Sequence, residues 1–179
     1  RLNEAYSKWL IVFNECPLAH SSIYTDGVKI VSALYAKEKD AVKKEEYYSL
    51  LMKVYDQRIK YFGNNAKYPA SYIKGLKAIS ILDYKRDNTD AVKEAYALLD
   101  ESVSGKIPTI QAAFTLSYMT SSVALYKEKA LTAEQIVNNY IKVADISDKL
   151  IASATDKTKD GFVQAKIGIE QVFASSGAA

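Results

Sequence analysis

The sequence predicts an all-α fold, a solenoid of antiparallel helix pairs with about eight helices. Apolar residues recur at three- and four-residue steps along almost the whole chain, which is helical spacing. The sequence shows no strand-like alternation of apolar and polar residues, and no hairpin turn between apolar runs. The predicted helix ends also recur at a regular interval, which is typical of stacked helical repeats.

The first predicted helix covers residues 3–14. Ala5, Trp9 and Val12 are spaced to share one face, and Pro17 follows where the helix must stop. A small residue, a large aromatic, an apolar residue and a terminating proline are typical of the second helix of a tetratricopeptide repeat. We therefore expect the chain to open on the second helix of a repeat.

Further helices with the same apolar spacing are predicted along the rest of the chain. Asp26 is a candidate N-cap for the first of them. Gly27 follows it directly, at a position where a close backbone approach would explain the lack of a side chain. Their approximate ranges are 26–37, 41–62, 69–84, 89–103, 107–127, 132–150 and 161–174.

Short local signals support the boundaries of these helices. Gly63 is a C-terminal stop, and Pro69 suits the first turn of the next helix. Thr89 or Asp90 is expected to cap the helix that follows. The segment Ile107-Pro108-Thr109 is expected to open the helix over residues 107–127.

Two signals mark the boundaries of the last two helices. Thr132 and Gln135 have the spacing of a capping box, with Gln135 three residues after the capping threonine. Residues 156–160 are strongly polar and are expected to form a link before the last helix.

The stops at Pro17, Gly63 and Pro108 recur about every 46 residues, which predicts repeated two-helix units. HEAT and armadillo units have about 40 to 47 residues, whereas a tetratricopeptide unit has about 34. Length favours the first group, and the pattern around Trp9 favours tetratricopeptide-like repeats with longer helices. We predict the second arrangement, in one helical-repeat domain over residues 1–179.

Composition and charge disfavour several classes of function. The net charge is +3, and lysines alternate with acidic residues, so a nucleic-acid-binding face is not expected. No apolar run approaches the ~20 residues of a membrane span. His20 is the only histidine and is expected in a solvated loop, and Cys16 is expected to be buried. We therefore predict no catalytic site, no metal site and no cofactor.

The chain has 14 tyrosines, and tyrosine suits recognition surfaces because it is large and has a polar tip. We align Gly27, Gly75 and Ser117 as equivalent small positions, which places an aromatic three residues before each of them. An aromatic ladder along a concave face would suit a peptide, although the same rings could simply pack between helices. The predicted partner-binding residues are Tyr24, Tyr72, Phe114 and Tyr118.

Several sequence blocks together resemble a known family. They are Glu4-Ala5-Tyr6 with Trp9, Glu15-Cys16-Pro17, residues 23–30, residues 51–58 with 60–63, and residues 173–179. The chain resembles exported tetratricopeptide-repeat proteins of unassigned role from Bacteroidetes, over nearly its whole length. The resemblance implies an export signal before Arg1, further helices after Ala179 and a periplasmic or envelope location. It implies no known activity.

The predicted function is a non-enzymatic scaffold or adaptor that binds a protein or peptide on the concave face of a helical-repeat solenoid. The alternative is an envelope module that binds a glycan or another small ligand by tyrosine stacking. A deep closed pocket of Tyr, Asn and Asp side chains would favour the alternative, whereas an open groove would favour a peptide. Self-association through the ends of the repeat array is also expected to be possible.

Overall fold

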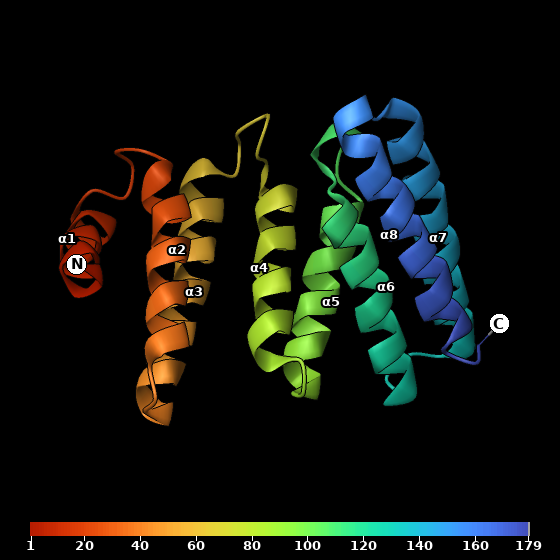
Figure 1. The fold of residues 1–179 in the computed structure, drawn as a ribbon, viewed down its shortest axis with the longest axis horizontal. Coiled ribbons are helices and arrows are strands. Elements are labelled where there is room, and N and C mark those ends of the chain that lie inside the picture. The colour runs from red at the N-terminus through yellow and green to blue at the C-terminus, as the bar shows by residue number, and fades with distance from the viewer. Residues whose placement is uncertain (179) are drawn as a thin grey trace. The chain divides into compact units, whose positions relative to one another are not determined.

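The computed structural model describes residues 1–178, which contain eight α-helices and one short 3₁₀ helix (Figure 1). The predicted all-α class is therefore confirmed over this range, and neighbouring helices pack mostly in sequential pairs. No helix of residues 1–178 is long and apolar enough to cross a bilayer. The elements are α1 (Leu2–Glu15), α2 (Ser22–Lys37), α3 (Ala41–Phe62), α4 (Ala70–Lys85), α5 (Thr89–Val103), η1 (Ile107–Thr109), α6 (Ala112–Lys127), α7 (Ala133–Ser153) and α8 (Asp156–Ala174).

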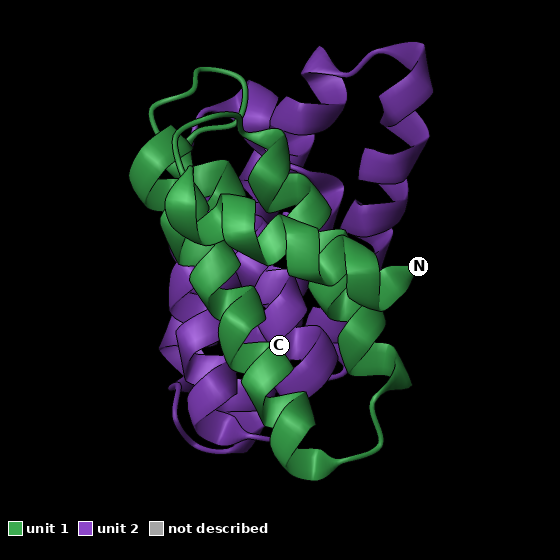
Figure 2. Ribbon diagram, turned by 90° about the vertical axis from the view of Figure 1, so that its left-hand side faces the viewer, with its two compact units in different colours: residues 1–73 green, residues 74–179 purple. Residues whose placement is uncertain are grey.

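The chain divides into two compact units, which Figure 2 colours separately. Unit 1 covers residues 1–73 and contains α1, α2, α3 and the first turn of α4. Unit 2 begins at Lys74 and contains the rest of α4 together with α5 to α8. We describe each unit by itself.

Unit 1 is held together at its start by Trp9, whose ring lies flat on α2. The indole nitrogen donates a hydrogen bond of 2.7 Å to the carbonyl of Ile23, and the ring covers Gly27. A Cβ atom at residue 27 would lie 2.5 Å from Cζ2 of Trp9, closer than any real contact. A close approach at Gly27 is present as predicted, but the neighbour is an aromatic ring and not another stretch of backbone.

Aromatic rings continue from Trp9 into the core of unit 1. The centroid of Phe13 lies 4.8 Å from that of Trp9, and the Tyr24 centroid lies 6.0 Å from that of Phe13. Phe62, at the end of α3, lies 5.7 Å from Tyr24. Offset and edge-on pairs at these separations stabilise beyond the area that they bury. This chain of rings therefore joins α1, α2 and α3.

Unit 2 contains the largest group of mutually packed helices. α5 packs against α6, and α6, α7 and α8 pack against one another, as Figure 1 shows. Gly75 of α4 is a second place of close approach, because a Cβ there would lie 2.5 Å from the Ser102 hydroxyl and 2.8 Å from the Phe114 ring. In this part of the chain α6 therefore contacts helices on several sides.

Most predicted helix boundaries agree with the structure. The helix predicted over residues 41–62 is α3, and Gly63 follows it as predicted. The capping box before α7 is present, because the Thr132 hydroxyl accepts from the Gln135 amide at 3.1 Å and Gln135 Oε1 accepts from the Thr132 amide at 2.8 Å.

The predicted N-caps of α2 and α5 were wrong. α2 begins at Ser22, so Asp26 lies inside it, because Ile23 and Tyr24 are buried by the first turn. The cap of α5 is Asn88, whose side chain accepts from the Ala91 amide at 2.9 Å, and not Thr89 or Asp90.

The secondary structure predicted for two segments near the later helices was also wrong. Residues 107–109 form a 3₁₀ turn that ends before α6, because Ile110 adopts an extended backbone and buries its side chain. Residues 156–160 are not a link but the first turns of α8. Polar residues suit the start of a helix as well as a loop, so their polarity alone did not distinguish the two.

On α1 the buried face was misplaced by the sequence pattern. Trp9 and Phe13 are buried, whereas Ala5 is exposed and Val12 is 40% exposed. A spacing of four residues continues the buried face from Trp9 to Phe13, where the pattern favoured Val12 at a spacing of three.

Candidate functional site

The four predicted partner-binding residues lie mainly in the core. Tyr24, Phe114 and Tyr118 are at most 1% exposed, and Tyr72 is half-buried. The rings pack between helices, which was the other reading of the pattern. A partner could reach the three buried rings only if the helices separated.

Tyr24 shows how a polar aromatic is held in such a core. Its hydroxyl donates a hydrogen bond of 2.8 Å to the carbonyl of Pro17, which satisfies the polar tip. Burial, with a smaller contribution from Tyr61, raises the pKa of Tyr24 to about 12. The residue therefore ties the loop after α1 to α2.

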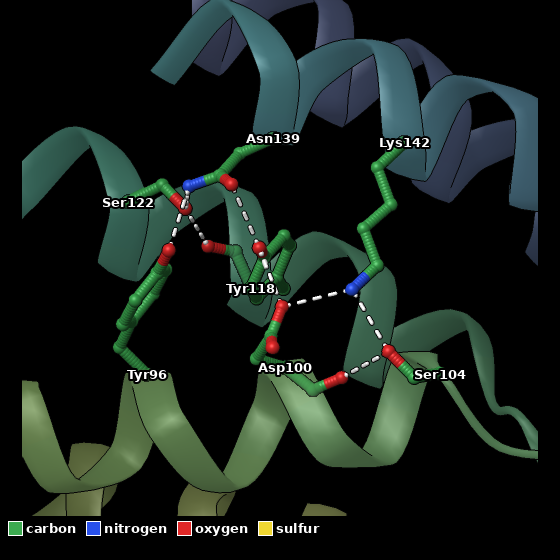
Figure 3. Close-up of polar contacts among 7 residues, drawn as sticks. All are labelled: Tyr96, Asp100, Ser104, Tyr118, Ser122, Asn139 and Lys142. Carbon is green, nitrogen blue, oxygen red and sulfur yellow. Dashed lines mark hydrogen bonds and ion pairs between the residues drawn. The ribbon is translucent and has the colours of Figure 1, made fainter. Parts of the chain in front are cut away.

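Tyr118 lies at the centre of a polar network in unit 2 (Figure 3). Its hydroxyl is 2.8 Å from Asp100 Oδ1 and 2.8 Å from Asn139 Oδ1. A phenol has one proton, so it donates to one of these oxygens at a time. Three helices, α5, α6 and α7, therefore meet at a single hydroxyl.

The Asn139 amide holds the buried end of the network. Its nitrogen donates to the Tyr96 hydroxyl at 3.0 Å and to the Ser122 hydroxyl at 3.2 Å. Ser122 in turn donates to the carbonyl of Tyr118 at 2.7 Å. The rings of Tyr96 and Tyr118 stack with their centroids 5.3 Å apart.

The Lys142 ammonium holds the outer end of the network. It donates to Asp100 Oδ1 and to the Ser104 hydroxyl, both at 2.8 Å, and lies 5.5 Å from the centroid of the Tyr118 ring. Burial is the main cause that raises the pKa of Tyr118, and hydrogen bonds with Tyr96 and Asp100 add to it. Tyr118 is therefore held neutral, and the network fixes α6 between α5 and α7.

Sequence reasoning identified Tyr118 but missed its partners. Tyr118 is on α6, whereas Asp100 is on α5 and Asn139 and Lys142 are on α7. The contacts of Tyr118 with Asp100 and Asn139, and of Lys142 with Asp100, join residues that are 18 to 42 positions apart in the sequence. A polar residue within an apolar stripe is a usable signal, and Asn139 stands within the stripe from Ile136 to Val143 on α7.

Two adjoining clefts in unit 2 lie between the end of α4, the start of α5 and α6. One has a volume of about 280 Å³ and the other of about 360 Å³, and both are lined by Arg86, Val92 and Ala124. We call the two together the α4–α6 cleft. The residues that line the part of about 280 Å³ are Leu82, Asp83, Arg86, Val92, Leu116, Ser117, Thr120, Ser121 and Ala124.

The floor of the α4–α6 cleft is made of small side chains on α6. Ser117, Thr120 and Ala124 follow one another at helical spacing, so a neighbouring chain could come close to the helix there. Asp83 and Arg86 are exposed and put both signs of charge on the α4 wall. Tyr118 does not line the cleft; it lies on the same helix, α6, and its hydroxyl takes part in the network of Figure 3, so the network holds the helix that forms this floor.

Residues that could carry other chemistry are isolated. His20 is exposed in the loop before α2, as predicted, and its Nδ1 accepts from the Ser22 amide at 3.1 Å. Cys16 is exposed, so the prediction that it is buried was wrong; it follows the last turn of α1, outside the buried face. Among residues 1–178, no three His, Cys, Asp or Glu side chains gather to hold a metal ion.

Comparisons with protein families, with curated proteins and with solved structures find no match to this chain.

Proposed function

We propose that this chain is a tetratricopeptide-like helical-repeat scaffold that binds a protein partner by an extended peptide segment in the α4–α6 cleft. The observation that carries the proposal is the cleft itself, an open hollow whose floor is made of small residues on one helix. Recognition grooves in proteins are concave and partly apolar, with a few polar groups that fix orientation.

Packing within each unit supports the repeat architecture. Trp9 on Gly27, Phe114 and Ser102 at Gly75, and Leu116 at Gly168 are contacts in which glycine lets helices approach closely. In unit 2, α6 contacts α8 as well as its sequence neighbours, which stacked helix pairs require.

An open cleft favours a peptide over a small glycan. In unit 2, Tyr118, Asn139 and Asp100 do converge, but their polar groups bind one another. The mixed charges of Asp83 and Arg86 suit a peptide of mixed composition. By the resemblance to exported repeat proteins, we place the partner in the periplasm or cell envelope.

A displayed library of random peptides, selected against the 179-residue chain, tests this function. The variant Ala124→Trp fills the cleft, because Ala124 is exposed and lines both of its parts. Ala97→Trp is the matched control, an exposed alanine on α5. Selected peptides are expected to bind the wild type and the control at least tenfold more tightly than Ala124→Trp, the effect of about 1.4 kcal/mol of lost contact.

Two results would overturn the proposal. Peptides that bind all three proteins equally would show that the cleft is not the binding site. A selection that enriches no peptide above the background on an unrelated helical protein would remove the peptide-binding function.

A further inference from the structure

A buried arginine in unit 1 has no acidic partner. Arg58 lies in the last third of α3 and is only 7% exposed. A buried charge is costly unless it is paired, so proteins normally bury arginine beside a carboxylate. Within residues 1–178, no hydrogen bond or ion pair joins the Arg58 guanidinium to another side chain.

The surroundings of Arg58 are aromatic rather than acidic. The titratable groups that act on it are the hydroxyls of Tyr72, Tyr55 and Tyr68. Burial lowers the pKa of the Arg58 guanidinium, and these tyrosines offset part of that effect. Arginine stays protonated in proteins, so the site holds a positive charge whose electrostatic partners are tyrosines and not a carboxylate.

Arg58 lines a small cavity of about 20 Å³, together with Ser21, Phe62, Asn65 and Tyr68. The Asn65 carbonyl oxygen is already used, because it accepts from the backbone amides of Lys67 and Tyr68, both at 2.9 Å. What remains free on Asn65 is its NH₂ group, which only donates. The Ser21 hydroxyl makes no capping bond to α2 and can also donate.

Two further positive features lie beside this cavity. Ser21 is the N-cap of α2, so the positive end of that 16-residue helix is at the cavity wall. The Lys67 ammonium lies 5.2 Å from the centroid of the Tyr68 ring, another wall of the cavity. The residues that line this cavity therefore include a cation and hydrogen-bond donors, and none of them is acidic.

We propose that Arg58 and its cavity form a binding site for a carboxylate group, supplied by the C-terminus or an acidic side chain of a bound peptide. The planar fork of a guanidinium matches the two oxygens of a carboxylate. A volume near that of one water molecule admits the tip of a planar group more readily than a tetrahedral phosphate. The site is in unit 1 and does not depend on the α4–α6 cleft.

Arginine side-chain NMR tests the site directly, because the sequence contains arginine only at positions 1, 58 and 86. The full chain is titrated with sodium acetate, with sodium chloride at equal ionic strength and with inorganic phosphate. The Arg58 Nε–H resonance is expected to shift saturably with acetate and not with chloride or phosphate. Arg1 and Arg86 are exposed and serve as internal controls.

The source of the carboxylate is separated by three probes. They are trialanine with a free C-terminus, trialanine amide, and N-acetylglutamate amide. Saturable binding of the first alone assigns the site to a chain end, and binding of the third assigns it to acidic side chains. If acetate moves Arg58 no more than chloride does, or moves all three arginines equally, the proposal is overturned. Equal binding of phosphate overturns the choice of carboxylate.

Thermal unfolding gives a second measurement with variants. At acetate concentrations about a hundredfold above Kd, the wild-type Tm is expected to rise by roughly 5–10 °C over chloride. Arg58→Met removes the charge at similar volume, so it is expected to fold and to lose this response. Arg58→Lys keeps the charge but not the fork, and is expected to respond at least tenfold more weakly. An acetate response that persists in Arg58→Met would contradict the site.

Discussion

In unit 1, an aromatic ring on a glycine joins α1 to α2, whereas in unit 2 a network of polar side chains joins α5, α6 and α7. The first contact needs one hydrogen bond, from Trp9 to the Ile23 carbonyl, and is otherwise apolar. The second has a hydroxyl, Tyr118, at its centre with an acid and an amide around it. The same kind of helix contact is thus made by two different chemistries.

The two kinds of contact are therefore sensitive to different kinds of substitution. An apolar contact depends on volume, so it fails when a side chain is removed or when the space beside it is filled. A polar network depends on matched donors and acceptors, so it fails when one partner is lost or changes its protonation state. The predictions below separate the two, from the largest expected effect to the smallest.

Removal of the aromatic ring is expected to have the largest effect. Trp9→Ala should lower the free energy of unfolding by about 3–5 kcal/mol, because the ring is 7% exposed and its loss leaves a cavity. Chemical denaturation followed by circular dichroism measures this change. Ile11→Ala is the control on the same helix, since Ile11 is 56% exposed, and is expected to change stability by less than about 0.5 kcal/mol. Equal effects of the two variants would show that the Trp9 contact does not hold α1.

A methyl group added beneath the ring tests the same contact from the other side. Gly27→Ala should destabilise by about 2 kcal/mol, because the new Cβ would lie 2.5 Å from the Trp9 ring. Gly161→Ala is the matched change in α8, where no atom lies within 4 Å of the new Cβ. It should stabilise by about 0.5–1 kcal/mol through helix propensity alone. Thermal unfolding of both variants measures these changes in stability. A Gly27→Ala variant more stable than the wild type would contradict the close approach.

High pH should weaken both units through buried tyrosines. The pKa of Tyr24 is raised to about 12 in the folded chain, and that of Tyr118 is also raised, whereas an unfolded tyrosine ionises near pH 10. Above pH ~10 the unfolded state therefore binds fewer protons than the folded state, so stability falls as pH rises. For Tyr24 the loss approaches about 2 kcal/mol by pH ~12. Denaturation at several pH values should show a shallower decline in Tyr24→Phe than in the wild type.

Loss of one hydroxyl from the network should have the smallest effect. Tyr118→Phe should destabilise by about 1–2 kcal/mol, because Asn139 Oδ1 loses its donor while Asp100 keeps Lys142. Tyr126→Phe, on the same helix and half-buried, is the control and should change stability by less than about 0.5 kcal/mol. A Tyr118→Phe variant as stable as the wild type would mean that the network positions helices without stabilising them.

The helices could be predicted from the sequence because their signals are local. Apolar spacing located α3, and the threonine and glutamine before α7 predicted its capping box. The early boundaries of α2 and α8 were missed because polar residues near a helix start resemble a loop until their burial or capping bonds are known. Gly27 was identified as a place of close approach, but nothing local named Trp9 as the neighbour.

The candidate sites were much harder to predict. Tyr24, Phe114 and Tyr118 fitted both a surface ladder and packing between helices, and rotation of each helix by a fraction of a turn decides whether such a ring points in or out. The α4–α6 cleft and the Arg58 cavity are each assembled from separate segments. A single sequence does not show which segments lie side by side in the fold. An arginine within an apolar stripe, such as Arg58 after Val54 and Tyr55, does indicate a buried charge.

Trp9 is the only tryptophan in the chain, and it forms part of the contact that joins α1 to α2. Its fluorescence is therefore a label-free reporter of that contact. While the ring covers Gly27 and bonds the Ile23 carbonyl, its emission comes from an indole shielded from water. Detachment of α1 would shift this emission to longer wavelength even if every other helix stayed folded. The sequence thus supplies its own optical probe for local opening at this end of unit 1.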